Sequence, residues 1–136
     1  IKLNKMEKQI SAFNLAISKK EGSAKLYLNK DNDGCHSLIQ ELNPGSEGLK
    51  VKTSDFDGFL SENSLKSIDL LKMDCEGAEM DILRSSSKLK SIKAIVMETN
   101  YQYFDEIKSI LSKNGFTVQQ IEDRPLLFAL NNKNNS

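Results

Sequence analysis

The sequence predicts an α/β fold, and three observations support this. Short apolar runs of strand length alternate with stretches of helical spacing between residues 68 and 115. Two of these runs, residues 68–73 and 92–97, are mostly apolar, as in strands buried in a parallel sheet. Two further runs between residues 116 and 130 are separated by a short polar turn, which indicates a hairpin. Strand, helix and strand in this order favour right-handed crossovers and a parallel sheet, with an antiparallel strand added at its edge by the hairpin.

The amino-terminal half predicts shorter elements. Residues 1–9 carry apolar side chains among lysines and are expected to end a helix and lead into a loop. Polar clusters at residues 29–34 and 43–48 mark turns. Between them, residues 35–39 are expected to be irregular or to form a short strand. Apolar runs and alternating patterns predict strands at residues 10–17, 24–28 and 49–53 and a short helix at residues 55–65.

The carboxyl-terminal half continues each buried strand into a helix. The first strand leads into the polar turn of residues 74–77, after which helical spacing extends to Leu89. Beyond the second strand, an amphipathic pattern begins at Phe104. This second helix is expected to stop at Gly115, because glycine commonly ends helices.

The chain is expected to close with a hairpin and a tail. Strands are predicted at residues 116–121 and 126–130, joined by a turn at 122–125. Residues 131–136 are all polar and are expected to form a disordered tail. The total of 136 residues suits one domain, which we place at residues 1–130.

Charge and composition argue against several classes of protein. The 19 basic and 19 acidic side chains give a formal net charge of +0, whereas a nucleic-acid partner would require a basic surface. No apolar run reaches the roughly 18 residues that a membrane span needs. Cys35 and Cys75 show no metal-binding spacing, and no signal peptide is recognisable, so a reducing cytoplasm is the expected location.

Acidic side chains follow both buried strands. Asp74 and Glu76 come directly after the first strand, and Glu98 comes after the second. Because the carboxyl ends of parallel strands meet at one edge of a sheet, these acids are expected to converge where α/β proteins bind ligands. Their carboxylates could accept hydrogen bonds from a ribose, an ammonium group or a substrate hydroxyl. Two alternatives remain open: Asp74 and Glu76 only cap the following helix, or the three carboxylates hold Mg²⁺ or Ca²⁺.

His36 is the only histidine and lies in a polar loop. Histidine changes charge near neutral pH, so this side chain is the candidate base if a proton must be moved, although a lone surface histidine is more often incidental. Lys72 is expected to pair with a carboxylate, and Tyr101 and Tyr103 are expected to pack where a helix starts. No GxGxxG, GxxxxGK[ST], GxSxG or HExxH motif is present.

Residues 68–83, IDLLKMDCEGAEMDIL, resemble the signature of the FkbM-type family of S-adenosylmethionine-dependent methyltransferases. In that family a strand continues through a D-x-E-G-A-E segment into a helix. Weaker similarities follow in the family's order, at residues 14–18, 24–28, 35–38, 51–55, 95–98 and 115–130. The resemblance covers about residues 1–130, and the D-x-E-G-A-E core is its most specific part.

The resemblance implies a Rossmann-like class I methyltransferase sheet with the strand order 3-2-1-4-5-7-6. It also implies S-adenosylmethionine as the methyl donor and a hydroxyl of a small molecule or carbohydrate as the acceptor, with O-methylation by in-line displacement. No nucleic-acid or membrane partner is expected. The site residues that follow are Ala16, Ile17, Ser18 and Asp74 for the cofactor, Glu76 and Glu98 for the acceptor, and Asp74, Glu76 and His36 for catalysis.

The chain departs from the family pattern in its first residues. The glycine-rich loop after the family's first strand and the acid after its second strand are not found, and residues 1–6 resemble the helix that follows them. The chain is therefore expected to be a fragment, with strand 4 at an open edge and strand 3 without a parallel neighbour. Such a fragment is expected to bind S-adenosylmethionine poorly, and to be unstable or to aggregate alone. The alternative function is a non-catalytic α/β binding domain.

Overall fold

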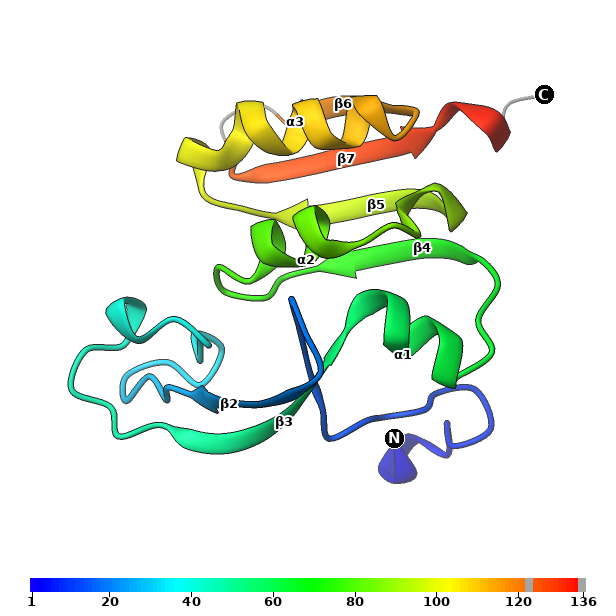
Figure 1. The fold of residues 1–136 in the computed structure, drawn as a ribbon. Coiled ribbons are helices and arrows are strands. Elements are labelled where there is room, and N and C mark those ends of the chain that lie inside the picture. The colour runs from blue at the N-terminus through cyan, green and yellow to red at the C-terminus, as the bar shows by residue number, and fades with distance from the viewer. Residues whose placement is uncertain (122–123, 135–136) are drawn as a thin grey trace.

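The computed structural model describes residues 1–121 and 124–134, and its elements are arranged as two sheets with helices (Figure 1). The strands are β1 (Ala16–Ser18), β2 (Gly22–Leu26), β3 (Leu49–Asp55), β4 (Ile68–Met73), β5 (Ile92–Glu98), β6 (Phe116–Ile121) and β7 (Leu126–Asn131). The α-helices are α1 (Phe56–Glu62), α2 (Glu79–Ser85) and α3 (Phe104–Lys113). The predicted α/β class is confirmed.

The larger sheet contains the two strands predicted to be buried and the predicted hairpin. Its order is β4-β5-β7-β6, in which β4 and β5 are parallel and β7 is antiparallel to both of its neighbours. Gly115, with a φ of +90°, follows α3 and leads into β6, as its position in the sequence predicted. The turn predicted at 122–125 lies partly outside the described residues. In the described part of the chain, β4 pairs with β5 alone, so the expected open edge is present.

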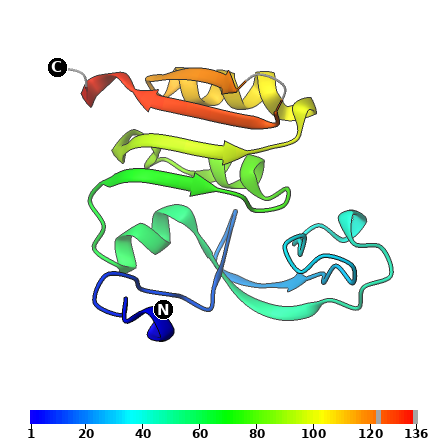
Figure 2. The same ribbon diagram turned by 180° about the vertical axis from the view of Figure 1, so that it is seen from behind.

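The hydrophobic core lies between this sheet and the helices. Helices α2 and α3 cover one face, whereas no helix lies in front of the opposite face in Figure 2. Leu70 on β4 is 59% exposed, in contrast to the fully buried core residues. The least exposed apolar side chains, at 0–2%, are Leu60, Leu83, Leu89, Ile92, Ile95, Met97, Ile107, Leu111, Leu127 and Ala129. Among the helices described, none is long and apolar enough to cross a membrane.

The smaller sheet corrects two predictions. Its order is β1-β3-β2, and β1 pairs in parallel with β3, so the expectation that this strand has no parallel neighbour is wrong. The strand predicted at residues 10–17 forms only at its end, and Phe13 packs edge-on against Phe59 of α1, with ring centroids 5.1 Å apart. The described residues thus form two sheets, and the seven-strand order 3-2-1-4-5-7-6 is not seen.

Smaller corrections concern the two ends of the chain. The helix end expected at residues 1–9 is a single 3-10 turn, Lys2–Asn4. The polar tail does not begin at residue 131, because Asn131 belongs to β7 and is 2% exposed. Its side-chain amide donates hydrogen bonds to the carbonyls of Lys90 and Ile92, at 3.2 and 3.0 Å. Residues 135–136 lie outside the described part of the chain.

A cluster around Asp57 ties α1 to the link between α2 and β5. The Asp57 carboxylate accepts hydrogen bonds from Ser86 Oγ at 2.6 Å and from Ser87 N at 2.9 Å. Ser87 Oγ donates a further bond at 2.5 Å, and Lys88 Nζ donates to the Asp57 carbonyl at 3.1 Å. Burial opposes ionisation of this carboxyl, but these hydrogen bonds outweigh it and lower its pKa below 3.8. The cluster therefore stabilises the charged form of Asp57 in the folded chain.

Replacing Asp57 with asparagine is expected to lower the free energy of unfolding by about 1–2 kcal/mol, because hydrogen bonds to an ionised group are lost. The depressed pKa means that this stabilisation is present above pH 3.8 and disappears as the pH falls through the folded-state pKa. Urea denaturation of both proteins, from pH 7 down to pH 3, measures the effect. Asp105→Asn, in the first turn of α3, is the matched control. Equal losses in the two variants would contradict the role of the cluster.

Candidate functional site

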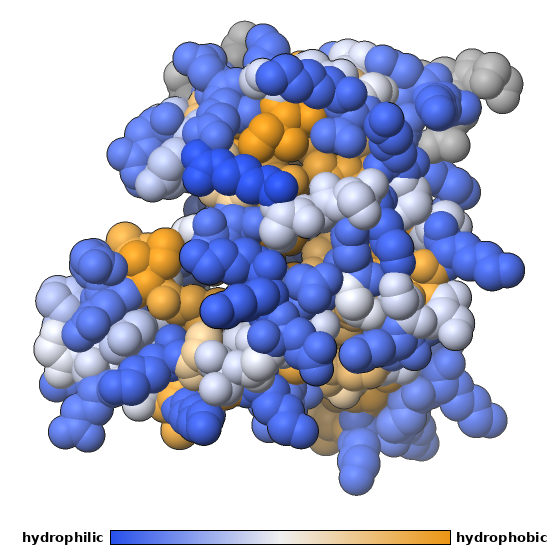
Figure 3. Space-filling model, in the orientation of Figure 1, coloured by the Kyte–Doolittle hydropathy of each residue, from blue (hydrophilic) through white to orange (hydrophobic). Residues whose placement is uncertain are grey.

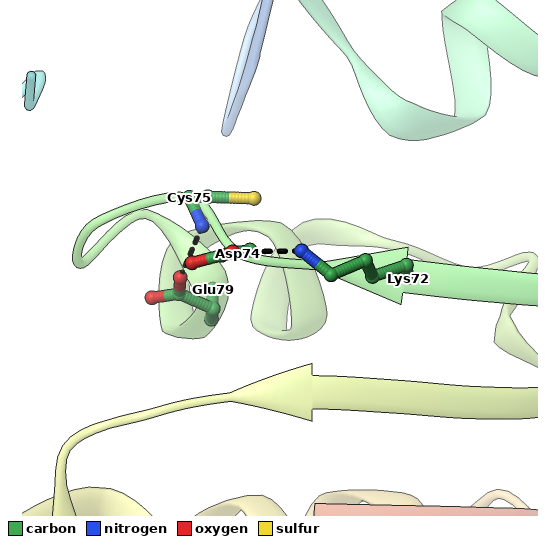
Figure 4. A network of polar contacts seen from close by, with 4 residues as sticks. All are labelled: Lys72, Asp74, Cys75 and Glu79. Carbon is green, nitrogen blue, oxygen red and sulfur yellow. Dashed lines mark hydrogen bonds and ion pairs between the residues drawn. The ribbon is translucent and has the colours of Figure 1, made fainter. Parts of the chain in front are cut away.

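The turn between β4 and α2 is held by a glutamate that the sequence did not single out. Helix α2 begins at Glu79 after Ala78, so the alternative that Asp74 and Glu76 cap this helix is wrong. The Glu79 carboxylate accepts hydrogen bonds from Cys75 N at 2.7 Å and from Gly77 N at 3.0 Å. Figure 4 shows Glu79 reaching back from the helix to Cys75. Because Glu79 is only 5% exposed, this contact is an internal brace of the turn.

The same turn contains two left-handed residues. Glu76 has a φ of +48° and Gly77 a φ of +100°. The loop of residues 35–43 packs against this turn from the smaller sheet. Ser37 Oγ donates a hydrogen bond to the Glu76 carbonyl at 2.6 Å. A Cβ atom at Gly77 would lie 2.7 Å from Ile39 Cδ1, so the loop and the turn approach each other at a place that only glycine permits.

Asp74 pairs with the lysine that precedes it on β4. Lys72 Nζ lies 2.7 Å from Asp74 Oδ2, as Figure 4 shows, which confirms that Lys72 pairs with a carboxylate. Both side chains are more than one-third exposed, so the pair adds little stability. The effect is on Lys72: the hydrogen bond that it donates to Asp74 raises the pKa of Lys72, so a positive charge stays beside that carboxylate.

A pocket of about 630 Å³ opens at the carboxyl ends of β4 and β5. This volume lies within the range of small-molecule sites. Its wall is formed by the 35–43 loop, the β4–α2 turn with the start of α2, the end of β5 with the segment after it, and the residue before β7. They are Ile39, Glu41, Leu42, Asp74, Glu76, Gly77, Glu79, Glu98, Thr99, Asn100, Tyr101, Gln102, Tyr103 and Pro125. In Figure 3, apolar side chains gather over the loop, where Ile39 and Leu42 are exposed, and the surface is hollowed between them and the start of α3.

The pocket is strongly acidic. It gathers all three acids predicted to follow the strands, Asp74, Glu76 and Glu98, together with Glu41 and Glu79. Among the described residues of the wall, none is lysine, arginine or histidine. Burial raises the pKa of Glu76, and the negative charges of Asp74, Glu98 and Glu79 raise it further. The pocket thus has acceptors for hydroxyl or ammonium groups and one carboxylate with increased basicity.

The other predicted site residues lie elsewhere. His36 is not in the pocket wall, and its Nδ1 accepts a hydrogen bond from Asn29 N at 3.0 Å, within its own loop. Ala16, Ile17 and Ser18 are also outside the wall, in β1 beside β3. The structure therefore brings together Asp74, Glu76 and Glu98, but it does not add His36 or β1 to them.

The alternative of a divalent-metal centre is not supported. In residues 1–121 and 124–134, no three histidine, cysteine, aspartate or glutamate side chains are arranged so that they could hold a metal ion. Asp74, Glu76 and Glu98 line the same pocket, but they do not form such a group. Hydrogen-bonding to an organic ligand remains the chemistry open to them.

Sequence reasoning missed several residues of the wall. Tyr101 and Tyr103 lie directly before α3, as expected, but they form a 3-10 turn on the pocket wall and are 55% and 37% exposed. Ile39 and Leu42 come from a distant loop, and no local pattern marks them. Glu79 could have been recognised, since an acid in a first helical turn often accepts bonds from the preceding backbone.

Comparison with protein families gives one match. The model described as the methyltransferase FkbM domain matches residues 1–118. A comparison with curated proteins finds no match, and neither does a comparison with solved structures. The matched range includes β4, β5 and the three helices, and it ends within β6.

Proposed function

Because the chain belongs to the FkbM methyltransferase family, we propose that its acidic pocket is the acceptor site for methyl transfer to a hydroxyl of a small molecule or carbohydrate. The observation that carries this proposal is the convergence of Asp74, Glu76 and Glu98 on one pocket at the ends of β4 and β5. Ligands of open α/β sheets bind at such strand ends. Methyl transfer to oxygen needs a bound hydroxyl and a group to take its proton, and carboxylates of this pocket could bind the hydroxyl and accept the proton.

Glu76 is the proposed proton acceptor. A base is most effective when its pKa approaches the working pH, and both burial and neighbouring charges move the pKa of Glu76 in that direction. Proton transfer to Glu76 would leave an alkoxide-like oxygen, which is the stronger nucleophile. His36, whose Nδ1 is engaged by Asn29 N outside the pocket, is not proposed in this role.

Asp74 and Glu98 are proposed to position the acceptor. Their carboxylates lie at the ends of adjacent parallel strands, so they could accept hydrogen bonds from two hydroxyls of one ligand. The absence of a cationic side chain from the described wall disfavours acceptors that carry phosphate or carboxylate groups. Tyr101 and Tyr103 add partly exposed aromatic surface beside these acids. Neutral polyhydroxylated acceptors, such as carbohydrates, suit this combination.

We propose S-adenosylmethionine as the methyl donor, but the residues described here fit only part of it. Its ribose hydroxyls and ammonium group could bind carboxylates of the pocket. Its own carboxylate would find no cation in the described wall, and the expected adenine contacts Ala16, Ile17 and Ser18 are outside it. We therefore assign no reaction step to the donor. The β4-β5-β7-β6 sheet is proposed to be part of a larger Rossmann-like sheet, with β4 as the strand that has an open edge.

The chain of 136 residues is accordingly expected to bind S-adenosylmethionine weakly or not at all. Isothermal titration of this chain, and of the longer protein proposed to contain it (hereafter the full-length protein), measures the difference. Micromolar binding by the chain alone would contradict the partial fit. Absence of binding by the full-length protein would favour the non-catalytic binding domain instead. The cytoplasmic location and the absence of nucleic-acid and membrane partners stay predictions.

A further inference from the structure

We propose that Ser37 is a positioning residue for the acidic pocket. Its hydroxyl group holds the Glu76 backbone in the left-handed conformation that places the Glu76 carboxylate in the pocket wall. The contact joins the two sheets across 39 positions of sequence. Its meaning for catalysis rests on the proposed function, whereas its effect on the turn can be measured without any methyl donor or acceptor.

The Ser37 hydroxyl is buried and fully engaged. Ser37 is 1% exposed, and its Oγ donates to the Glu76 carbonyl at 2.6 Å while accepting from Ile39 N at 3.0 Å. If the Ser37 hydroxyl were removed, a water molecule could take its place as donor only if the loop and the turn moved apart. The Glu76 carbonyl would then have to find another partner or change its direction.

The loop that carries Ser37 is itself held in place. Ser37 N and O pair with Tyr27 O and N at 3.1 and 2.7 Å, which attaches the loop to the end of β2. Asn43 Nδ2 donates to the carbonyls of Tyr27 and Cys35, at 3.0 and 2.9 Å. Asn43 is 4% exposed. Because Ser37 is fixed on its own side, its hydrogen bond can constrain the turn.

The turn needs this constraint. A non-glycine residue is less stable with a positive φ than in its ordinary conformations, and Glu76 has a φ of +48°. Glu79 binds the N–H groups of Cys75 and Gly77, on either side of Glu76. Among the described residues, Ser37 alone donates a hydrogen bond to the Glu76 carbonyl. Loss of this bond is expected to let the Glu76 side chain leave the pocket.

The proximity of other acids provides a readout. In the pocket wall Glu76 faces Asp74, Glu79 and Glu98, and burial together with these charges raises its pKa above the ordinary 4.5. A side chain that swings into solvent loses both effects.

The experiment is an NMR titration of the Glu76 side-chain carboxyl in the 136-residue chain. Ser37→Ala is expected to move its pKa down toward 4.5 while core signals persist. Ser37→Thr, which keeps the hydroxyl, should restore the higher value. Ser46→Ala is the matched control, because Ser46 Oγ bonds to the backbone of the same region, at Leu28 N, but not to the turn.

An unchanged Glu76 pKa in folded Ser37→Ala would overturn the proposal. If Ser37→Ala does not fold, the same titration is made on Ser37→Cys. Cysteine nearly preserves the volume of serine, but its thiol is a weak hydrogen-bond donor. A Glu76 pKa in Ser37→Cys equal to that of the wild type would also overturn the proposal, and a lowered one would support it. Failure of methyl transfer in the full-length protein would leave these titration results unaffected, so the two proposals fail separately.

Discussion

Replacing Glu76 with glutamine is expected to lower the kcat of methyl transfer by about 100-fold or more, since general-base catalysis contributes roughly 10²–10⁴. Glutamine keeps the size and hydrogen-bonding capacity of the side chain but cannot take the hydroxyl proton. KM for the acceptor should change little, because Asp74 and Glu98 remain in the pocket. Steady-state kinetics of the full-length protein, with wild-type and variant pockets, measure both constants.

The role of Glu76 also predicts how the kcat of methyl transfer depends on pH. Glu76 acts as a base only when it is ionised, and its pKa is raised above 4.5. The kcat of the wild type should therefore increase with pH through the pKa of Glu76 and then level off. The variant should lack this acid limb. Glu41→Gln removes a different carboxylate from the same pocket and should retain it. An unchanged acid limb in Glu76→Gln would show that another group accepts the proton.

Replacing Gly77 with alanine is expected to lower the free energy of unfolding by about 2–3 kcal/mol, because a steric clash adds to the strain of a positive φ. Gly77 has a φ of +100°, where a side chain is disfavoured in any surroundings. In addition, the new Cβ would lie 2.7 Å from Ile39 Cδ1 and 3.2 Å from Leu42 Cδ1. The 35–43 loop must then move away from the turn, so the pocket wall would be disturbed too. Urea denaturation at neutral pH measures the loss.

Two controls separate strain from steric contact. Gly45 has a φ of +79° and nothing within 4 Å of its added Cβ, so Gly45→Ala should lose only about 1 kcal/mol. Combining Gly77→Ala with Ile39→Ala should recover part of the loss, because the nearest atoms are removed. Equal losses in Gly77→Ala and Gly45→Ala, without recovery in the double variant, would contradict the close packing of loop and turn.

The sheet around β4 and β5 was predictable because each strand is a compact apolar run, although Leu70 on the uncovered face of β4 is 59% exposed. The hairpin was predictable because turn residues separate two strand-length runs. The smaller sheet was harder to predict from the sequence. β1 forms only over Ala16–Ser18, and its parallel pairing with β3 depends on residues more than thirty positions away. Local patterns do not carry such long-range pairing.

The candidate site also contains residues that the sequence predicts and residues that it does not. Asp74, Glu76 and Glu98 were predictable, because the carboxyl ends of neighbouring parallel strands meet at one edge. The contribution of the 35–43 loop could not be predicted, because Ser37 contacts Glu76 only through the packing of distant segments. The brace at Glu79 depends on where α2 starts, which a run of three acids over residues 74–79 does not determine.

The most direct test of the acceptor-site proposal is the detection of a methylated product. The full-length protein is incubated with isotopically labelled S-adenosylmethionine and a panel of neutral sugars and small alcohols, beside a variant that combines Asp74→Asn with Glu76→Gln. The wild type is predicted to place label on an acceptor oxygen, and the folded variant is predicted to lose this activity. Equal labelling by both proteins would show that the acidic pocket is not the site of methyl transfer.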